Sequence, residues 1–273
     1  MSRDRSPTDP VAASGGGAEP APNPFRILES LRSDEEPCVY LPKRSAEVDY
    51  QVLEGCPPEA YQKLLERGWR RFGQVFFRPA CATCQECVGL RIDVDRFQPS
   101  RSQRRAWRRN RDVRIFLRRP RLSREHLELY EAFHRERTEH RGWEPQEADP
   151  HTYFLTFVHG AEAFGYELAL EIDGRLVAVA LLDLLPRGVS AVYCYYDPQH
   201  RHRSLGTFAV LAEIELARSR GIPHVYLGFR VEGNASMIYK KRFQPYQLLS
   251  GRPRPSEAAP WSPPLAKTAE EAL

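Results

Sequence analysis

Hydrophobic positions in the second half of the chain alternate first with the period of strands and then with the period of a helix. Two strand-like runs flank Asp173-Gly174, a pair typical of a tight hairpin turn because both residues tolerate positive φ. A third strand, a loop, a long helix with a wide apolar stripe and a buried strand follow. The pattern predicts strands at 166–172, 175–184, 189–196 and 224–229, and helices at 204–220 and 234–241.

The first half contains shorter elements with clear start and stop signals. Pro57-Pro58 and Gly68 bracket a predicted helix over 59–67, because proline suits the first helical turn and glycine suits the end. Ser123 and Gly142 are a favourable N-cap and stop for a second helix. The other elements predicted in this half are strands at 74–78 and 88–94, a basic helix at 102–111, and the capped helix at 123–141.

The order of these elements predicts an α+β fold. An antiparallel meander is followed by strand, helix and strand, and a strand that returns parallel to its neighbour needs such a crossover helix. Both ends of the chain are rich in Pro, Gly, Ala and Ser and have few large apolar residues. Segments of this composition bury too little apolar surface to become ordered, so residues 1–24 and 251–273 are predicted to be disordered tails.

Composition narrows the class of protein. The chain has 273 residues, of which 41% are hydrophobic, and this is enough for a sizeable core. No apolar run approaches the length of a membrane-spanning helix, and the first residues lack the apolar segment of a secretion signal. We therefore expect a cytoplasmic protein without a membrane partner or structural disulfides.

Positive charge is concentrated in one window. Residues 101–121 contain ten Arg and one Asp, a net charge of +9 in a chain whose total is +4, so the remainder is −5. Such a patch suits a polyanion, because each phosphate contact releases condensed counterions. The alternative is a solvated Arg-rich helix face. The candidate RNA-binding residues here are Arg101, Arg104, Arg105, Arg108 and Arg109, with Trp107 as a stacking partner.

Three of the six cysteines form a dense cluster, Cys81-x-x-Cys84-x-x-Cys87. Thiolates at this spacing can converge on zinc or on an iron–sulfur cluster, and Cys38 is the best candidate for a fourth ligand. The alternative is that these cysteines fill small buried sites and bind nothing. Cys56 and Cys194 are interpreted as structural.

The loop before the long helix has the chemistry of a phosphate site. Arg203-Ser-Leu-Gly206-Thr-Phe208 resembles the Arg/Gln-x-x-Gly-x-Gly/Ala fingerprint of the Gcn5-related N-acyltransferase (GNAT) superfamily, in which a helix N-terminus binds phosphate. Phe208 replaces the last small residue and is expected to crowd a coenzyme A pyrophosphate. The element order also resembles this superfamily. It implies a GNAT-like acyltransferase core at 123–250, preceded by an N-terminal Cys-cluster and basic α+β region at 25–122.

Longer blocks resemble one family in particular. They are Pro37-Cys-Val-Tyr-Leu-Pro, Gly68-Trp-Arg-Arg-Phe-Gly73, Phe76-Phe-Arg-Pro79, Pro99-Ser-Arg-Ser-Gln-Arg-Arg105, Tyr195-Tyr-Asp-Pro198, Tyr226-Leu-Gly228 and Met237-Ile-Tyr-Lys240. Together with the cysteine cluster they are similar to the bacterial aspartate/glutamate leucyltransferases, which are relatives of the eukaryotic arginyl-tRNA–protein transferases. The resemblance runs from about residue 37 to 249.

This resemblance implies an enzyme that moves leucine from leucyl-tRNA to proteins beginning with Asp or Glu, and whose products pass to an adaptor of the Clp protease. The donor is already an activated ester, so no cofactor is required for transfer. Three alternatives stay open: an arginyl donor in place of leucyl, an acyl-coenzyme A N-acyltransferase, and a non-enzymatic nucleic-acid-binding module.

Candidate site residues follow from the chemistry of aminoacyl transfer. Asp197 is a candidate base or amine-positioning carboxylate, with an Asp-Pro turn as its alternative role. Tyr239 could protonate the leaving 3′-oxygen, and Lys240 could contact the terminal phosphates; a core aromatic and a solvated lysine are the alternatives. Arg203 and Gly206 belong to the predicted RNA site. Arg70, Arg71 and Arg78 are candidates for the acceptor carboxylate, each with a structural salt bridge as its alternative.

Overall fold

The structure is a computed structural model that describes residues 24–146 and 148–265. Within those ranges the strands form a large mixed sheet, a small antiparallel sheet and a short ribbon, β2 (Glu36–Pro37) with β3 (Ser45–Ala46). The small sheet has the order β1 (Arg26–Arg32), β4 (Val48–Glu54), β6 (Val75–Pro79) and β5 (Arg70–Phe72). The predicted tail at 1–24 lies, but for its last residue, outside the described residues.

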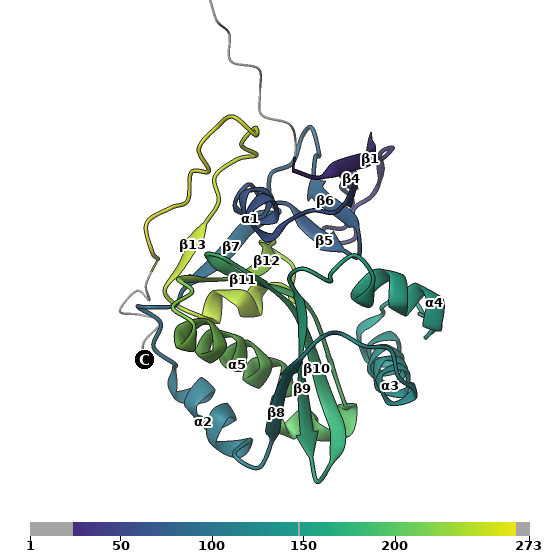
Figure 1. Ribbon diagram of the computed structural model, residues 1–273, viewed down its shortest axis with the longest axis vertical. Helices are drawn as coiled ribbons and strands as arrows, with labels where there is room; N and C mark the ends of the chain where they lie inside the picture. The colour runs from purple at the N-terminus through teal and green to yellow at the C-terminus, as the bar shows by residue number, and fades with distance from the viewer. Residues whose placement is uncertain (1–23, 147, 266–273) are drawn as a thin grey trace, which may run out of the picture.

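The large sheet forms the centre of the molecule (Figure 1). Its order is β13 (Tyr246–Leu248), β7 (Val88–Asp93), β12 (His224–Arg230), β11 (Gly188–Tyr196), β10 (Arg175–Leu185), β9 (Gly165–Ile172) and β8 (Arg114–Arg118). The predicted hairpin between β9 and β10 is confirmed, because Asp173 and Gly174 have φ of 50° and 77°. The mixed α/β architecture expected from the sequence is therefore present.

Helices cover the two faces of the large sheet (Figure 1). α2 (Arg101–Arg109) and α5 (Leu205–Ser219) lie on one face, and α3 (Arg124–Arg141), α4 (Pro150–Tyr153) and the π-helix η1 (Phe154–Val158) lie on the other. Apolar residues of β10 alternate between the two resulting cores, with Ala180 on the α5 side and Val179 on the α3 side. The remaining helices are α1 (Pro58–Glu66) and the 3₁₀-helices η2 (Pro198–Arg203) and η3 (Ile238–Arg242).

Local sequence signals explain most of these boundaries. Ser100 and Gln103 form a reciprocal capping box at the start of α2, and Ser123 caps α3. Gly142 ends α3 in the left-handed conformation, as its position predicts. The helix predicted at 234–241 is shorter than expected. The Asn234 side chain accepts from the amide of Ser236 and donates to the carbonyl of Tyr40, which favours a turn before η3.

Two predicted divisions of the chain need correction. β7 comes from the predicted N-terminal region, yet it lies between β12 and β13 in the large sheet. Leu90 and Ile92 of β7 are fully buried, as expected for a strand with a neighbouring strand along each edge. Both neighbours come after residue 122, so the large sheet crosses the boundary predicted there.

The segment predicted to be a disordered tail from residue 251 is ordered as far as residue 265. It is held by contacts with distant parts of the chain. The Trp261 indole donates to the carbonyl of Glu66, and Arg67 and Arg78 donate to carbonyls of the segment. Residues 266–273 of the predicted tail lie outside the described residues.

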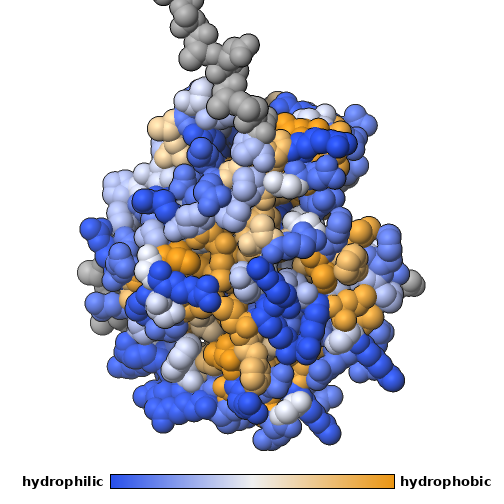
Figure 2. Space-filling model, in the orientation of Figure 1, coloured by the Kyte–Doolittle hydropathy of each residue, from blue (hydrophilic) through white to orange (hydrophobic). Residues whose placement is uncertain are grey.

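The visible face of the molecule is hydrophilic around its rim and has apolar surface over β1 and beside α4 (Figure 2). The exposed apolar residues of these regions include Ile27, Leu28 and Leu31 on β1 and Phe154 and Leu155 on η1. Among the described helices, none combines the length and apolarity that crossing a bilayer requires.

Candidate active site

β11 and β12 run parallel but part soon after they start. Their register covers only two pairs, Val189 with Val225 and Ser190 with Tyr226. β12 shifts its register against β7 between Tyr226 and Phe229, where Gly228 has φ of 78°. The second halves of β11 and β12 therefore diverge, and backbone groups along this side of β11 are left without a ladder partner. A sheet that opens in this way can admit an extended ligand between two strands.

Tyr239 of η3 lies at this opening. The residue is 40% exposed overall, while its hydroxyl lies toward Cys194 of β11 and Glu213 of α5. Burial, followed by the charges of Cys194, Glu213 and Tyr196, raises the pKa of the Tyr239 hydroxyl above its usual value. Tyr239 therefore stays protonated near neutral pH and can donate a hydrogen bond, and its role as proton donor to the leaving 3′-oxygen stays a prediction.

Glu213 is a site residue that the sequence did not indicate. Its side chain is on α5 and is 2% exposed, and its Oε2 atom has no hydrogen-bond partner in the described part of the chain. Burial raises the pKa of this carboxyl to about 8. The one available signal was an acidic residue within the apolar stripe of the predicted helix at 204–220.

Lys240 is buried rather than solvated. It is 7% exposed and its Nζ donates to the carbonyl of Phe229 at 2.6 Å. Burial, and then the positive charge of Arg70, lowers the pKa of Lys240 to about 7. The alternative of a solvated helix lysine is therefore wrong, and contact with the terminal phosphates stays a prediction.

The three arginines predicted to meet an acidic acceptor have different surroundings. Arg71 is 3% exposed and its guanidinium forms a two-point pair with Asp183, with its third nitrogen donating to the carbonyl of Gly73. Each of its three nitrogens donates one hydrogen bond, so the structure favours the structural ion pair, which was the alternative role of this residue. Arg78 donates to Pro253 and lies 3.5 Å from Asp49, so it is also engaged.

Arg70 differs from the other two because no carboxylate meets it in the ion pairs that the described chain forms. It is buried and it contacts backbone carbonyls, and its Nε, like that of Arg78, has no hydrogen-bond partner among the described residues. Arg70 therefore remains a candidate for an anionic ligand.

Asp197 is placed at the end of β11 as expected, but its carboxylate is engaged locally. One oxygen accepts from the amide of Gln199 at 2.9 Å and the other lies 2.9 Å from Nδ1 of His200. These contacts cap η2, which agrees with the Asp-Pro turn that was the alternative reading of this residue.

The N-terminus of α5 opens beside the parted strands. No side chain caps this helix, and Ser204 adopts the left-handed conformation with φ of 57°. A Cβ on Gly206 would stand 3.3 Å from the Tyr196 ring, so glycine lets the two elements approach closely. The first-turn N–H groups are thus free of a side-chain cap, and phosphate binding at this turn stays a prediction. Arg203 is instead held by Asp112 at 2.8 and 2.9 Å.

The arginine-rich helix α2 lies against the same part of the molecule. Gln103 and Ala106 face inward, while the five candidate residues Arg101, Arg104, Arg105, Arg108 and Arg109 are exposed. Asn110 donates to the carbonyl of Arg203, and Arg109 donates to that of His202, so the end of α2 contacts η2 directly. The positive surface therefore continues toward the start of α5.

Phe208 does not crowd the start of α5, which corrects the expectation from the fingerprint. It is 2% exposed, and its ring packs against Trp107 of α2 with centroids 5.1 Å apart. The bulky residue fills the contact between the two helices and does not project toward the phosphate loop.

The predicted metal ligands are neighbours without a metal-binding arrangement. Burial and the nearby Cys38, Cys81 and Cys84 raise the pKa of the Cys87 thiol to about 12. Cys84 accepts from Arg44 at 3.3 Å, and Arg252 donates to the carbonyls of Cys81 and Cys84. Across residues 24–146 and 148–265, no three His, Cys, Asp or Glu side chains are arranged to hold a metal ion. A metal ion held by Cys38, Cys81, Cys84 and Cys87 therefore stays a prediction.

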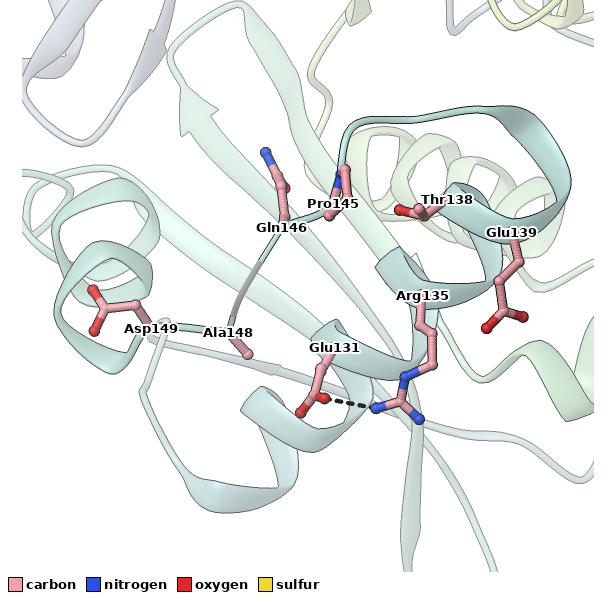
Figure 3. A pocket seen from close by; sticks show the side chains of 8 residues that line it. All are labelled: Glu131, Arg135, Thr138, Glu139, Pro145, Gln146, Ala148 and Asp149. Carbon is pink, nitrogen blue, oxygen red and sulfur yellow. Dashed lines mark hydrogen bonds and ion pairs between the residues drawn. The ribbon is translucent and has the colours of Figure 1, made fainter.

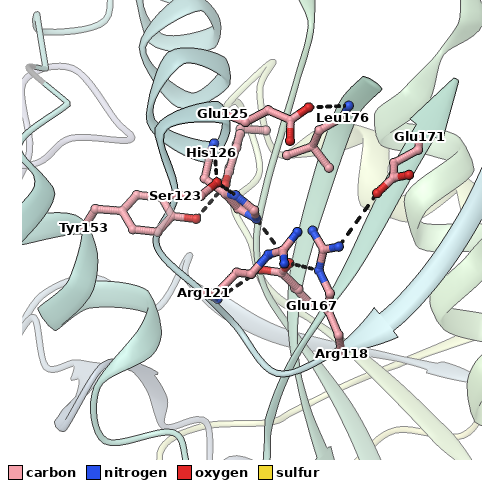
Figure 4. A network of polar contacts seen from close by, with 10 residues as sticks. Arg118, Arg121, Ser123, Glu125, His126, Tyr153, Glu167, Glu171 and Leu176 are labelled. Atoms are coloured by element: carbon pink, nitrogen blue, oxygen red, sulfur yellow. Dashed lines mark hydrogen bonds and ion pairs between the residues drawn. The ribbon is translucent and has the colours of Figure 1, made fainter. Parts of the chain in front are cut away.

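Two further features lie away from the parted strands. A hollow of about 590 Å³ is bounded by α3 and the following loop, and Glu131, Glu139 and Asp149 make its lining acidic (Figure 3). An acidic hollow suits neither RNA nor an acidic acceptor. Fully buried Glu167 pairs with Arg118 at 2.7 Å and contacts His126 at 3.1 Å (Figure 4). This network joins β8, β9 and α3 and is interpreted as structural.

Comparisons with known proteins match nearly the whole described chain. Residues 36–105 and 125–250 match the models described as arginine-tRNA-protein transferase, N terminus and C terminus. An aspartate/glutamate leucyltransferase of Campylobacter jejuni is 41% identical over 217 residues, covering 80% of this chain and 91% of that protein. One of Helicobacter hepaticus is 36% identical over 237 residues, covering 87% and 98%.

A solved structure, the PaiA N-acetyltransferase of Thermoplasma acidophilum in complex with coenzyme A, overlaps this chain with a TM-score of 0.32. The two sequences are 14% identical, and the overlap covers 47% of this chain and 88% of that one.

Proposed function

The chain belongs to the arginine-tRNA–protein transferase family, and from this premise we propose that it transfers leucine from leucyl-tRNA to proteins that begin with Asp or Glu. The relatives that it matches over most of their length carry the name aspartate/glutamate leucyltransferase, which supports leucine over arginine as the donated residue. The same proposal includes recognition of the leucine-tagged products by an adaptor of the Clp protease.

One observation carries this function most directly. The gap between β11 and β12, the uncapped start of α5 and the exposed arginines of α2 all meet on one part of the molecule. A meander, a crossover helix and a parted parallel pair are also what a GNAT-like core requires, and we include that fold in the proposal. The arginines would hold the RNA backbone, and the first turn of α5 would receive a phosphate near its 3′ end.

The reaction needs an amine nucleophile, a stabilised oxyanion and a proton for the leaving oxygen. The α-ammonium of the acceptor loses a proton, and the amine attacks the ester carbonyl of leucyl-tRNA. A new C–N bond forms and the C–O bond to the 3′-oxygen breaks. The nitrogen loses one further proton, which balances the proton taken up by the leaving oxygen, so the only net release is the proton lost from the ammonium. Unpaired backbone N–H groups at the gap can stabilise the oxyanion, and the Tyr239 hydroxyl can supply the proton to the leaving oxygen.

A parallel assay tests the donor and the acceptor together. Radiolabelled leucyl-tRNA, arginyl-tRNA and acetyl-coenzyme A are offered separately with peptides beginning with Asp, Glu or Lys. We expect label only from leucyl-tRNA and only on the Asp and Glu peptides. Transfer from acetyl-coenzyme A alone would establish the acyl-coenzyme A alternative, and RNA binding without transfer to any peptide would establish the non-enzymatic one.

A further inference from the structure

Two buried cations meet over one glycine of β12. Arg70 begins β5 and is 6% exposed, and Lys240 lies in η3 and is 7% exposed. A Cβ placed on Gly228 would stand 3.7 Å from Nζ of Lys240 and 4.0 Å from Nε of Arg70. A Cβ at this position would be in ordinary van der Waals contact with both positive groups, so the absence of a side chain keeps the space of one carbon atom open beside them.

Within the described chain, neither cation has a carboxylate partner. The Arg70 guanidinium donates to the carbonyls of Leu65, Trp69 and Gly228, and its buried Nε has no partner. Lys240 Nζ donates to the carbonyl of Phe229 and to Sδ of Met237. Buried charges in proteins are normally paired, so two like charges in one place without an anion require an explanation.

The neighbouring ionisable groups do not neutralise this charge. Burial raises the pKa of the Cys87 thiol to about 12, so it faces Lys240 as a neutral group. Tyr61 and Tyr226 lie near Arg70, and burial raises the pKa of each hydroxyl, so both are also neutral. The two cations instead face each other, and burial with the charge of Arg70 lowers the pKa of Lys240 to about 7.

This pair lies across the sheet from the arginine-rich helix. The Arg70 guanidinium stands 5.8 Å from the centre of the Tyr226 ring, which packs with Tyr61 and Trp69, whereas the neighbouring Val225 and Leu227 pack with α5. Successive residues of a strand point to opposite faces, so an RNA on the α5 face and a ligand at Arg70 would approach from opposite sides of β12. The gap between β11 and β12 joins the two sides, and Tyr239 precedes Lys240 directly.

We infer that Arg70 and Lys240 bind the side-chain carboxylate of the N-terminal Asp or Glu of the acceptor protein, above Gly228. The assignment rests on the proposed function and names the acceptor part of its site. A guanidinium with a free Nε direction and an ammonium supply two charge-assisted donors to one carboxylate, which an Asn or Gln side chain cannot match. The anion also relieves the repulsion between the two cations.

The test uses the full chain without RNA, so that it does not depend on transfer. Binding of a short peptide beginning with Asp is compared by calorimetry with that of the same peptide beginning with Asn. Wild type should bind the Asp peptide at least about tenfold more tightly, because a hydrogen bond to a charged group contributes about 1.5–3 kcal/mol. Lys240→Gln should abolish this preference, and Lys240→Arg should retain it.

Lys241→Gln is the matched control, because Lys241 is the next residue but its ammonium pairs with Glu232 at the surface. It should keep the full preference for Asp. Thermal unfolding checks that each variant folds, and Lys240→Met replaces Lys240→Gln if the latter does not. Equal binding of Asp and Asn peptides to wild type, or an unchanged preference in both uncharged variants, overturns the assignment. A preference for Asp in a protein that transfers no leucine would keep this carboxylate site and reject the proposed function.

Discussion

The indole of Trp107 on α2 packs against the ring of Phe208 on α5, with their centroids 5.1 Å apart. Phe208 is almost fully buried, so this contact joins the arginine-rich helix to the helix whose N-terminus opens at the parted strands. The exposed arginines therefore keep a defined direction relative to the first turn of α5. Under the proposed function, this contact orients the arginines toward the bound RNA.

Loss of two exposed arginines of α2 should weaken tRNA binding. Arg104→Ala combined with Arg105→Ala removes two phosphate contacts and should lower the slope of log affinity against log salt by about 2. Filter binding of leucyl-tRNA at several salt concentrations measures this. Arg124→Ala with Arg135→Ala is the control, since these exposed arginines lie on α3 across the sheet. An equal effect of both pairs would point to nonspecific charge.

Removal of the Tyr239 hydroxyl should slow the chemical step. Tyr239→Phe should lower kcat about a hundredfold through loss of the proton donor, with tRNA affinity unchanged. Single-turnover transfer from saturating leucyl-tRNA gives the rate. Tyr166→Phe is the control, because Tyr166 lies on β9 with its ring against the Arg119 guanidinium. This variant should leave the transfer rate unchanged. A wild-type rate in Tyr239→Phe would show that Tyr239 does not supply the proton to the leaving oxygen.

Replacement of Asp197 by Asn should have little effect. The amide oxygen of Asn can still accept from the N–H of Gln199, so the turn at η2 keeps its cap and the transfer rate should stay within about twofold. The same single-turnover assay measures the rate. A loss of several orders of magnitude would return Asp197 to the role of a base.

Breaking the buried pair of Arg71 and Asp183 should destabilise the fold. Asp183→Ala leaves a buried guanidinium without its partner and should cost about 3–5 kcal/mol in the free energy of unfolding, measured by urea titration. Arg71→Met with Asp183→Leu should recover much of this loss, because an apolar pair replaces the ion pair. If the free energy of unfolding of Asp183→Ala equals that of wild type, the ion pair does not stabilise the fold.

The preference for an acidic acceptor should depend on pH through Lys240. Its pKa is lowered to about 7, so the free protein loses the ammonium, and with it the attraction for a carboxylate, as the pH rises above 7. The ratio of Asn-peptide to Asp-peptide dissociation constants should fall by up to about tenfold per pH unit there.

The peptide carboxylate and the shared α-amine do not obscure this change, since the first is ionised throughout and the second cancels in the ratio. Lys240→Arg should show a flat ratio, because its guanidinium stays charged. If the ratio of dissociation constants still falls with rising pH in Lys240→Arg, the titrating group is not Lys240.

Elements governed by neighbouring residues were predictable from the sequence. The Asp173-Gly174 turn, the caps of α3 and the crossover helix α5 were confirmed, because turn chemistry and helical periodicity act over a few residues. The donor role of Tyr239 stays a prediction. The family blocks extended this to function, since they cover most of the chain.

Partners distant in the sequence were not predictable. Arg71 meets Asp183 and Arg70 meets Lys240 only after the small sheet packs on the large one, so the sequence offered no way to choose among Arg70, Arg71 and Arg78. Lys240 looked like a surface lysine because its burial comes from Gly228 and Phe229, on a strand that precedes it. Glu213 was hidden for the same reason, as one polar residue in an apolar stripe.

The position of β7 between β12 and β13 affects how the protein is made. β7 leaves the ribosome more than a hundred residues before β12, and its two edges have no strands to pair with until β12 and β13 follow. The large sheet therefore cannot form in full before these two strands are synthesised, and a nascent chain that stops before β12 exposes the apolar side chains of Leu90 and Ile92. Completion of the sheet thus depends on strands that are made much later than β7.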